Sequence, residues 1–283
     1  MNSMTSRILN GKEYPRLTEI LSSTDPPHVR RQLANWKRKN PSTYYADLGT
    51  VVHEWVSKAV VCRGEIQDIL LKPLEECSTV TELWDRGYVF ECQHPTKNFV
   101  LSIWEFPEKL QHSWFVKCKL LCPIIRAVDK VFWAEEDLVG GNKTFLTYED
   151  SVCCFSTRPD LICTFKNNPD RIWLVELKTS KGLYSDQPCP ESWVIGGTQV
   201  TDNGKVVQIQ PWKARSQQIG YEKYLKTSTQ LYAQSLAISQ SLGFEVSDHM
   251  IWVATNKDFQ LLKVKHNAAA DWNARVQQYF EAA

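Results

Sequence analysis

The sequence of 283 residues contains no apolar run of the roughly 18 residues that a helix needs to span a bilayer. Its polar opening, Met1 to Ser6, also lacks the apolar core of a signal peptide. These two absences argue against a membrane protein and against a secreted one. We therefore expect an intracellular protein that does not act at a membrane.

Cysteine pairs of the C-x-x-C type are missing as well. The nine cysteines are an odd number, and none of them forms the C-x-x-C pairs that are typical of zinc-binding motifs. In a reducing compartment we expect most of these thiols to be small buried hydrophobic groups rather than disulfides.

The chain also has almost no net charge: its formal value at pH 7 is +1. A net charge this small does not indicate a nucleic-acid-binding protein. The charges are unevenly distributed: residues 1–40 contain eight Lys or Arg against three acids, and residues 65–91 contain two against seven. A local basic face would suffice to hold a phosphate backbone, although an ordinary mixed surface explains the same counts. With 43% hydrophobic residues, the chain is long enough for a sizeable core in one large domain or two small ones.

What the sequence does contain is a predicted β-hairpin with charged side chains on one face. The segments 156–162 and 171–180 are rich in apolar and β-branched residues, and a turn-forming Asn-Asn-Pro-Asp run separates them. Alternate side chains of a strand share a face, so Glu176 and Lys178 project together. If Asp160 lies beside them on the neighbouring strand, two carboxylates and one ammonium converge. A divalent cation would relieve the repulsion, because hard carboxylate oxygens suit Mg²⁺ or Mn²⁺.

These residues carry a family resemblance. Pro159-Asp160, followed sixteen residues later by Glu176-x-Lys178, resembles the signature of the PD-(D/E)xK nucleases. In that superfamily the acids bind metal and the lysine assists an attacking water. The resemblance therefore implies metal ligation by Asp160, Glu176 and the carbonyl of Leu177, with a water-activating role for Lys178. The tripeptide alone is more typical of a surface hairpin with one salt bridge, so the nuclease interpretation depends on the further motifs elsewhere in the chain.

A predicted helix over residues 44–62 supplies a histidine. His53 lies at the edge of the apolar stripe of this helix, where a lone histidine is usually a hydrogen-bonded structural residue. The pattern Gly49-x-x-x-His53, however, resembles the helical histidine motif of RecB-type nucleases and of mitochondrial genome maintenance exonucleases. This resemblance implies that His53 reaches the metal centre, where imidazole is a competent ligand for Mn²⁺. Glu54 points about 100° away around the helix, and we expect it to be solvated.

A second predicted helix, over residues 219–242, carries a glutamine motif. Gln230, in the run Gln-Leu-Tyr-Ala, resembles the glutamine that closes the RecB-type active site. The resemblance implies that Gln230 positions Lys178 or a phosphate. The chain departs from the family four residues later, where relatives usually have tyrosine and this sequence has Gln234.

Relatives often carry a further glutamate on the strand that precedes the aspartate strand. Here the pattern predicts that strand over residues 130–139, paired through a Gly-Gly-Asn turn with residues 143–148. Either Glu135 or Glu136 would then approach the metal, and alternation does not choose between them. An exposed acid on an edge strand is the more usual role for such a residue.

Two segments interrupt the resemblance. Residues 65–112, predicted as short helices followed by a hairpin, form a candidate inserted subdomain. Residues 182–218 form a second insertion next to the site, with a predicted small hairpin of 193–195 with 205–209. This second insertion is either a packing or partner surface or a clamp for single-stranded DNA. The clamp would use Trp193, Trp212, Lys213 and Arg215 for stacking and phosphate contact.

The two ends of the chain extend the resemblance. The run Tyr-Pro-Arg-Leu-Thr-Glu-Ile-Leu at 14–21, followed by a basic helix over 28–40, is similar to the opening of RecB-like and phage-type exonucleases. Residues 249–255 and 259–264 form a predicted hairpin, and a last helix covers 267–280. This ending is similar to that of the mitochondrial genome maintenance exonucleases.

Together these motifs predict one nuclease domain over residues 1–283, an α/β fold of the restriction-endonuclease-like class with a mixed central sheet flanked by helices. The resemblance implies a deoxyribonuclease dependent on Mg²⁺ or Mn²⁺, acting as an exonuclease on DNA ends or single strands in recombination, repair or replication. It also implies the cytoplasm of a bacterial or phage-infected cell, or another intracellular setting. A site-specific or structure-specific endonuclease and a non-catalytic DNA-binding protein stay as alternatives. Some RecB-type nucleases hold an iron–sulfur cluster with one early cysteine and three cysteines near the C-terminus. No cysteine follows Cys189 in this sequence, so we do not expect such a cluster here.

Overall fold

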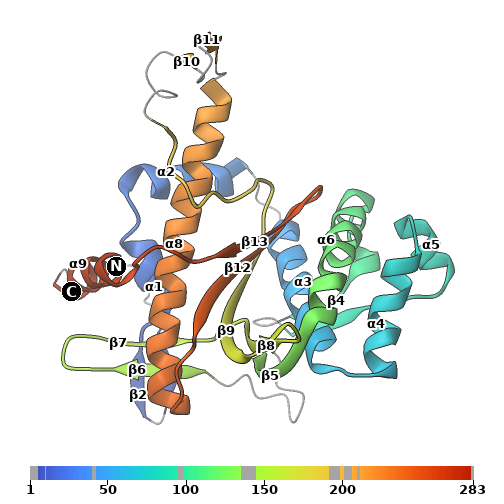
Figure 1. Cartoon of the computed structure of the whole chain (residues 1–283), viewed down its shortest axis with the longest axis horizontal. Helices are drawn as coiled ribbons and strands as arrows, with labels where there is room; N and C mark the ends of the chain where they lie inside the picture. Colours follow the sequence, from blue (N-terminus) through green and yellow to red (C-terminus); the bar gives the residue numbers. More distant parts are fainter. Residues whose placement is uncertain are drawn as a thin grey trace.

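The computed structural model describes residues 6–9, 11–39, 43–94, 98–134, 145–190, 198–200, 206–208 and 211–281. Its centre is a five-stranded sheet in the order β13-β12-β9-β8-β5 (Figure 1). The strands are β5 (Val128–Ala134), β8 (Leu161–Phe165), β9 (Asn168–Thr179), β12 (Asp248–Ala254) and β13 (Phe259–Lys263).

The sheet is mixed. β9, its middle strand, runs antiparallel to β8 and parallel to β12, whereas β5 and β13 run antiparallel to their neighbours at the two edges. A parallel pair needs a long crossover connection, and the connection between β9 and β12 contains the helix α8 (Pro211–Leu242). The predicted mixed α/β architecture is therefore confirmed, as are the β8–β9 and β12–β13 hairpins.

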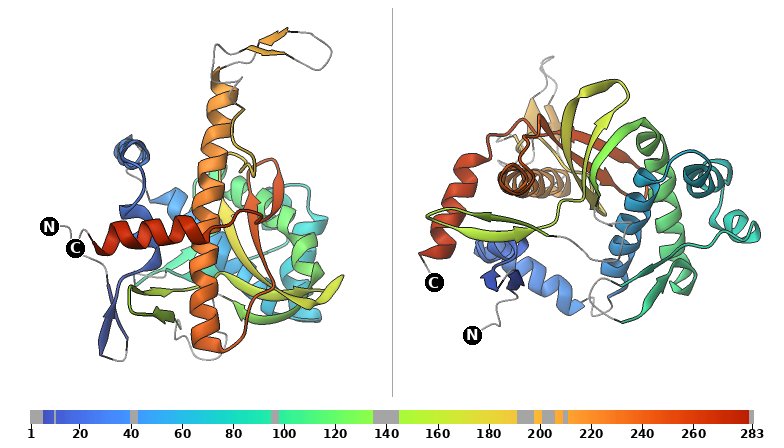
Figure 2. Two further views of the ribbon diagram at one scale, coloured as in Figure 1. Left: turned by 60° about the vertical axis from the view of Figure 1, so that its left-hand side comes forward. Right: turned by 90° about the horizontal axis from the view of Figure 1, so that it is seen from below.

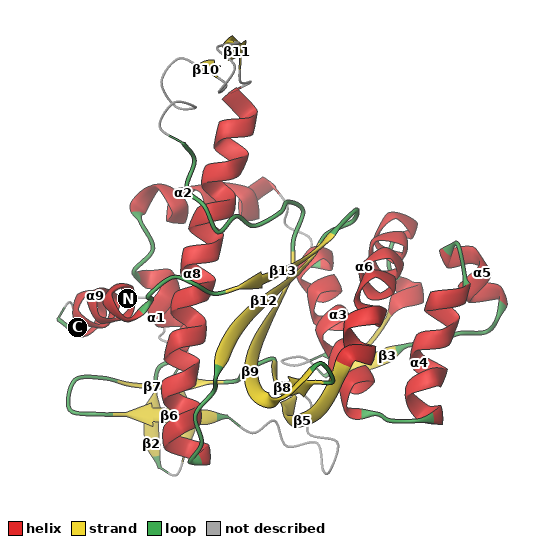
Figure 3. Cartoon of the chain, viewed as in Figure 1, coloured by secondary structure: helices red, strands yellow, loops and turns green. Residues whose placement is uncertain are grey.

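Helices cover both faces of the sheet (Figures 2 and 3). Apolar side chains of β9 pack on both faces of the sheet. Val175 and Leu177 belong to one buried cluster, and Leu174 belongs to the other. One layer contains α3 (Tyr44–Val61), α4 (Glu65–Glu76), α5 (Val80–Asp85) and α6 (Glu108–Ala127). The other contains α1 (Leu17–Ser23), α8 and α9 (Ala269–Phe280).

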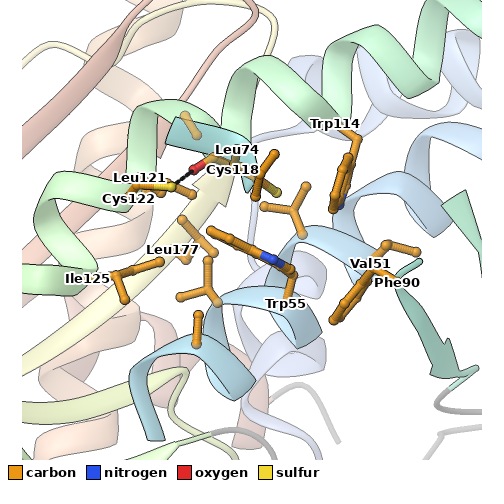
Figure 4. Packing of buried hydrophobic residues seen from close by; sticks show 14 of the residues in the cluster. Val51, Trp55, Leu74, Phe90, Trp114, Cys118, Leu121, Cys122, Ile125 and Leu177 are labelled. Atoms are coloured by element: carbon orange, nitrogen blue, oxygen red, sulfur yellow. Dashed lines mark hydrogen bonds between the residues drawn. The ribbon is translucent and has the colours of Figure 1, made fainter. Parts of the chain in front are cut away.

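The first cluster is built around aromatic side chains between α3 and α6 (Figure 4). Trp55 is fully buried, lies edge-on to Trp114 with ring centroids 6.5 Å apart, and donates its indole N–H to the hydroxyl of Tyr88 at 3.0 Å. Phe90 stacks on Trp114 with ring centroids 6.3 Å apart. Since Tyr88 and Phe90 come from the segment 65–112, that segment shares one core with the helices that cover the sheet.

Small elements complete the chain. A β-hairpin of β1 (Arg7–Leu9) and β2 (Lys12–Tyr14), which the sequence pattern did not predict, precedes the predicted basic helix α2 (Pro27–Lys39). Gly11, in the turn of that hairpin, has a positive φ of 78°, a conformation that favours glycine. The predicted hairpin within residues 65–112 consists of β3 (Glu91–Gln93) and β4 (Val100–Ser102), followed by the 3₁₀ helix η1 (Ile103–Glu105).

The predicted pairing of residues 130–139 with 143–148 is wrong. β6 (Leu146–Glu149) pairs instead with β7 (Cys154–Thr157), and β5 pairs with β8. The reason lies in the turn after β6, where the carboxylate of Asp150 accepts the backbone N–H groups of Val152 and Cys153, both at 2.7 Å, and so closes a tight hairpin. The candidate metal ligands Glu135 and Glu136 lie outside the described residues.

The prediction of one strand over residues 156–162 also needs correction. Ser156 and Thr157 belong to β7, and β8 begins at Leu161. Pro159 lies in the break between the two strands, consistent with its lack of a backbone N–H for a sheet ladder. Asp160 is therefore placed immediately before β8 rather than inside a strand.

The helix predicted from residue 219 begins eight residues earlier, so α8 includes the last part of the predicted insertion 182–218. In the figures its N-terminal end extends away from the sheet, with the two short strands at its tip (Figure 1). The small hairpin exists, but its first strand is β10 (Thr198–Val200) rather than 193–195, paired with β11 (Val206–Gln208). Trp193 and the side chain of Trp212, which the clamp hypothesis uses, lie outside the described part of the chain.

The thiols behave as the sequence indicates. All nine cysteines are free, and all but Cys62 and Cys154 are buried. Burial raises the pKa of Cys122 and of Cys163 to about 12, so these groups are inert thiols at neutral pH.

No helix among the described residues combines the length and the apolar character needed to cross a bilayer.

One buried lysine connects α6 to the turn between β12 and β13. Lys117 is 4% exposed and donates to the hydroxyl of Ser113 at 2.8 Å and to the side-chain oxygen of Asn256, in the turn between β12 and β13. Ser113 donates to the same oxygen at 2.6 Å. Burial lowers the pKa of Lys117 to about 8. The fold therefore holds an ammonium that water would solvate better.

This lysine gives the stability of the protein a dependence on pH. Because its pKa is about 8 in the folded state and 10.5 unperturbed, the unfolded chain binds more protons between these values, and the free energy of unfolding rises as the pH goes from 8 to 10.5. We expect the rise in wild type to exceed that in Lys117→Met by about 1–3 kcal/mol. Urea unfolding at several pH values measures it, with Lys109→Met, an exposed lysine of the same helix, as the control. Identical curves for wild type and Lys117→Met would contradict the prediction.

The aromatic cluster yields a second prediction. Trp55→Ala should lower the free energy of unfolding by about 3–5 kcal/mol, because it leaves a large cavity and removes the partner of Tyr88. Trp84→Ala is the matched control, since Trp84 is 54% exposed although it lies edge-on to Trp104. For this control we expect a loss of about 1 kcal/mol or less. Chemical denaturation of the two variants, compared with wild type, makes the test.

Candidate functional site

A buried carboxylate in the middle strand of the sheet forms the centre of the site. Glu176 of β9 is 3% exposed, and its side chain points toward α8. Oε1 accepts hydrogen bonds from the ammonium of Lys178 at 2.5 Å and from the amide of Gln230 at 2.6 Å. Oε2 accepts one from the amide of Gln234 at 3.3 Å. The oxygen of the Gln230 amide in turn accepts from Lys178 at 3.3 Å.

This arrangement results from two periodicities. Residues two apart on a strand share a face, which places Glu176 and Lys178 together. Residues four apart on a helix lie one above the other, which aligns Gln230 and Gln234 on the side of α8 that faces β9. The strand and the helix therefore each contribute two polar side chains to the same small volume.

The electrostatics of this group are finely balanced. Burial raises the pKa of Glu176, and the neighbouring Asp160 carboxylate raises it further, against the opposing effect of Lys178. Burial also lowers the pKa of Lys178, but the carboxylates of Glu176 and Asp160 outweigh it and raise the pKa of the ammonium above its ordinary value. Lys178 is thus held as a cation between two acids.

Asp160 approaches from the neighbouring strand. The β8–β9 register pairs Leu161 with Val175, so the residue before β8 lies next to the continuation of β9. Its Oδ2 accepts the backbone N–H of Leu177 at 2.7 Å. The carbonyl of Pro159 accepts the indole N–H of Trp133 at 3.2 Å, which holds the turn against β5. The side chain of Asp160 is 15% exposed, so it is open to a ligand on one side.

His53 reaches the same place from α3. Its Nδ1 lies 3.5 Å from Oδ1 of Asp160, and its side chain is 23% exposed. Gly49, one turn earlier, faces β9 so closely that a Cβ there would lie 3.2 Å from the hydroxyl of Thr179. The glycine of the Gly-x-x-x-His pattern thus allows α3 to approach the end of β9 and bring the histidine next to Asp160.

The expectation that Glu54 is solvated is wrong. Glu54 is 4% exposed, because α3 is enclosed over most of its circumference rather than along one stripe. It lines a cavity of about 380 Å³ together with His53, Arg158 and Tyr45. A carboxylate from α3 itself therefore lies at the cavity that His53 lines.

A second cavity, of about 240 Å³, opens directly on the candidate residues. We call it the arginine-lined cavity, since three arginines contribute to its wall beside the acids. His53 and Arg158 line both cavities, which therefore adjoin each other at these two side chains. The arginine-lined cavity is bounded by Arg7, Arg16, Leu17, Thr18, His53, Ser156, Thr157, Arg158, Asp160, Glu176 and Gln230.

The donor set fits a divalent cation in its chemistry. Asp160 and Glu176 offer hard carboxylate oxygens, and His53 offers an imidazole that suits Mn²⁺. Among the described residues, however, no three His, Cys, Asp or Glu side chains are already grouped as metal ligands. The geometry explains this, because Lys178 and Gln230 engage Oε1 of Glu176 and the Leu177 amide engages Oδ2 of Asp160. Ligation would require these side chains to exchange partners.

Of the predicted site residues, the structure brings together His53, Asp160, Glu176, Lys178 and Gln230, and Leu177 contributes a backbone N–H that donates to Asp160. It also adds four that sequence reasoning did not assign to the site: Gln234, Arg7, Arg16 and Arg158. Gln234 could have been found from its spacing of four residues after Gln230. Arg7 and Arg16 gave no signal beyond their place in a basic N-terminal stretch, because only the fold brings that stretch to the site.

The two glutamines should differ in their effect on stability. Gln230→Leu removes a 2.6 Å bond to Glu176 and an acceptor for Lys178, so we expect it to lower the free energy of unfolding by about 1–3 kcal/mol. Gln234→Leu removes only one longer bond and an oxygen that has no partner among the described residues, so its loss should be smaller. Urea unfolding of the two variants compares them, and a larger loss for Gln234→Leu would contradict this geometry.

Comparison with known proteins adds little. No protein-family model matches the chain, and no curated protein matches it. Among solved structures, the chain is similar to the crystal structure of a protein described as "Putative exonuclease" from Eubacterium rectale, with a TM-score of 0.28 and 13% identity. The match covers 60% of this chain and 52% of that one, so it spans about half of the other protein's length. A likeness at this level carries no argument about fold or activity, so any functional conclusion depends on the geometry of the site.

Proposed function

We propose that this protein is a deoxyribonuclease dependent on Mg²⁺ or Mn²⁺, built on a restriction-endonuclease-like fold, and that it acts as an exonuclease on DNA ends or single strands. The observation that carries the proposal is the meeting of Asp160, Glu176 and Lys178 at one place on the central sheet. The ammonium of Lys178 compensates one of the two negative charges, and a bound divalent cation would compensate the charge that remains. Hydrolysis of a phosphodiester is chemistry that such a group supports.

The residues have distinct tasks in this proposal. Asp160 and Glu176 would hold one or two divalent ions, with the Leu177 carbonyl and His53 completing the ligands. When bound, such an ion stabilises negative charge on the reacting phosphate and lowers the pKa of a coordinated water. Lys178 donates a hydrogen bond that orients the attacking water or a phosphate oxygen. Gln230, which touches both Lys178 and Glu176, fixes the direction of that ammonium.

Removal of either charge at the centre tests the proposal. With end-labelled linear DNA and Mg²⁺ or Mn²⁺, Asp160→Asn and Lys178→Ala should each reduce the rate of cleavage by roughly a hundredfold or more, because each acts on the reacting groups. Chelation by EDTA should stop the wild type. The matched controls are Asp170→Asn and Lys166→Ala, which change exposed residues of the same hairpin and should keep the wild-type rate.

Closed circular DNA separates the alternatives in the same assay. An exonuclease leaves the circle intact, whereas a site-specific or structure-specific endonuclease opens it. Full cleavage of linear DNA by Lys178→Ala would reject the catalytic assignment. A wild type that binds DNA but leaves it uncut with either metal would instead identify a non-catalytic DNA-binding protein.

A further inference from the structure

Three arginines from distant parts of the sequence converge beside the candidate site. Arg7 belongs to β1, Arg16 directly precedes α1, and Arg158 lies in the break between β7 and β8. The chain around Arg16 is tied to β7, because the N–H of Ser156 donates to the carbonyl of Pro15 at 2.9 Å and Arg16 forms a bridge with Ser156. All three arginines belong to the wall of the arginine-lined cavity, and so do Asp160 and Glu176.

The three cations are close enough to disturb one another. Burial and, to a smaller extent, the neighbouring charges of Arg16 and Arg158 lower the pKa of Arg7 to about 10. The guanidinium of Arg7 stacks on the ring of Phe145 at 3.4 Å from its centroid, and that of Arg158 lies 5.7 Å from the same centroid. One aromatic ring therefore holds two like charges beside the cavity.

Arg7 and Arg16 lack a counter-charge among the residues that the structure describes. Within the described residues neither forms an ion pair with a carboxylate, and Nε of Arg16 is buried without a hydrogen-bond partner. A buried donor of a charged group costs free energy when it has no acceptor, and repulsion among clustered like charges adds to that cost. An anion in the cavity would relieve both, since the guanidinium fork matches the oxygens of a phosphate.

We propose that Arg7, Arg16 and Arg158 form a phosphate-binding subsite that holds one phosphate of a nucleic-acid strand next to the carboxylate pair. The identity of the ligand as nucleic acid rests on the proposed function, whereas the anion site itself does not require catalysis. The phosphate is either a terminal monoester or an internal diester, which share the same chemistry. In both cases the subsite fixes the strand beside Asp160 and so selects which neighbouring bond is presented to the site.

The test measures binding without cleavage. Fluorescein-labelled single-stranded oligonucleotides that end in a phosphate or in a hydroxyl are titrated with protein in EDTA at several salt concentrations, and anisotropy is recorded. Arg7→Gln and Arg16→Gln should each weaken binding roughly tenfold, the loss of a charge-assisted hydrogen bond. Each should also reduce the slope of log K against log salt by roughly one. Arg158 is left unchanged because it lies two residues from Asp160.

Two controls make the comparison specific. Arg63→Gln removes the same charge from an exposed position where the guanidinium donates to backbone carbonyls, so affinity and slope should stay at wild-type values. Arg16→Lys keeps the charge without the fork, so it should keep the slope and lose affinity. Inorganic phosphate should compete with the oligonucleotide for wild type and compete more weakly for Arg16→Gln. Circular dichroism and thermal unfolding check that each variant is folded.

The outcomes separate the subsite from the nuclease. A loss confined to the phosphate-ended oligonucleotide supports the subsite and identifies a terminal monoester, and an equal loss for both oligonucleotides supports it and identifies an internal diester. Unchanged affinity and slope in Arg7→Gln and Arg16→Gln overturn the subsite, even if the wild type cleaves DNA. Weakened binding in these variants of a protein that cleaves nothing leaves the subsite standing and removes the proposed function.

Discussion

The burial of one carboxylate constrains the whole site. Glu176 sits in the middle strand of the sheet, beneath α8, where it is almost completely buried and an uncompensated charge would be very costly. The protein meets this cost with one ammonium and two amides, each from a fixed position on β9 or α8. The register of the strand and the placement of the helix are therefore both tied to this acid, because a shift of one residue in either would remove its partners.

The two helical layers bring the remaining parts to that acid. α3 lies on one face of the sheet and carries His53, while α8 lies on the other face and carries the glutamines. The layer of α8 is fixed by a second buried acid, Asp25, which follows α1 and pairs with Lys226 of α8 and Arg275 of α9. Rigid packing on both faces is what holds side chains from separate elements within hydrogen-bonding distance of one another, a condition for any site that must position a reacting group.

Charge is divided sharply within this small region. Asp160 and Glu176 carry the negative charge at the sheet, and Arg7 and Arg16 carry positive charge in the wall of the same cavity. Lys178 lies between the acids as a cation, so it occupies the place where a divalent ion would compete with it. The proposed cation site and the proposed phosphate subsite are thus complementary halves: the acids would bind a cation, the arginines would bind an anion, and a phosphate ester bound with a metal ion supplies both.

Local periodicity in the sequence was enough to predict the central hairpin, the helices of His53 and Gln230, and the shared face of Glu176 and Lys178, because these depend on residues two to four positions apart. It did not predict the β6–β7 pairing, which depends on hydrogen bonds made by one aspartate side chain in a turn, nor the burial of Glu54, which depends on what encloses α3. It also did not predict that the arginines converge, since they lie far apart in the sequence and their spacing matches neither the helical nor the strand period. The sequence by itself determined which chemical groups are present and which neighbours share a face; only the tertiary structure decided which distant groups meet, because that is set by the packing of layers whose contacts span the whole chain.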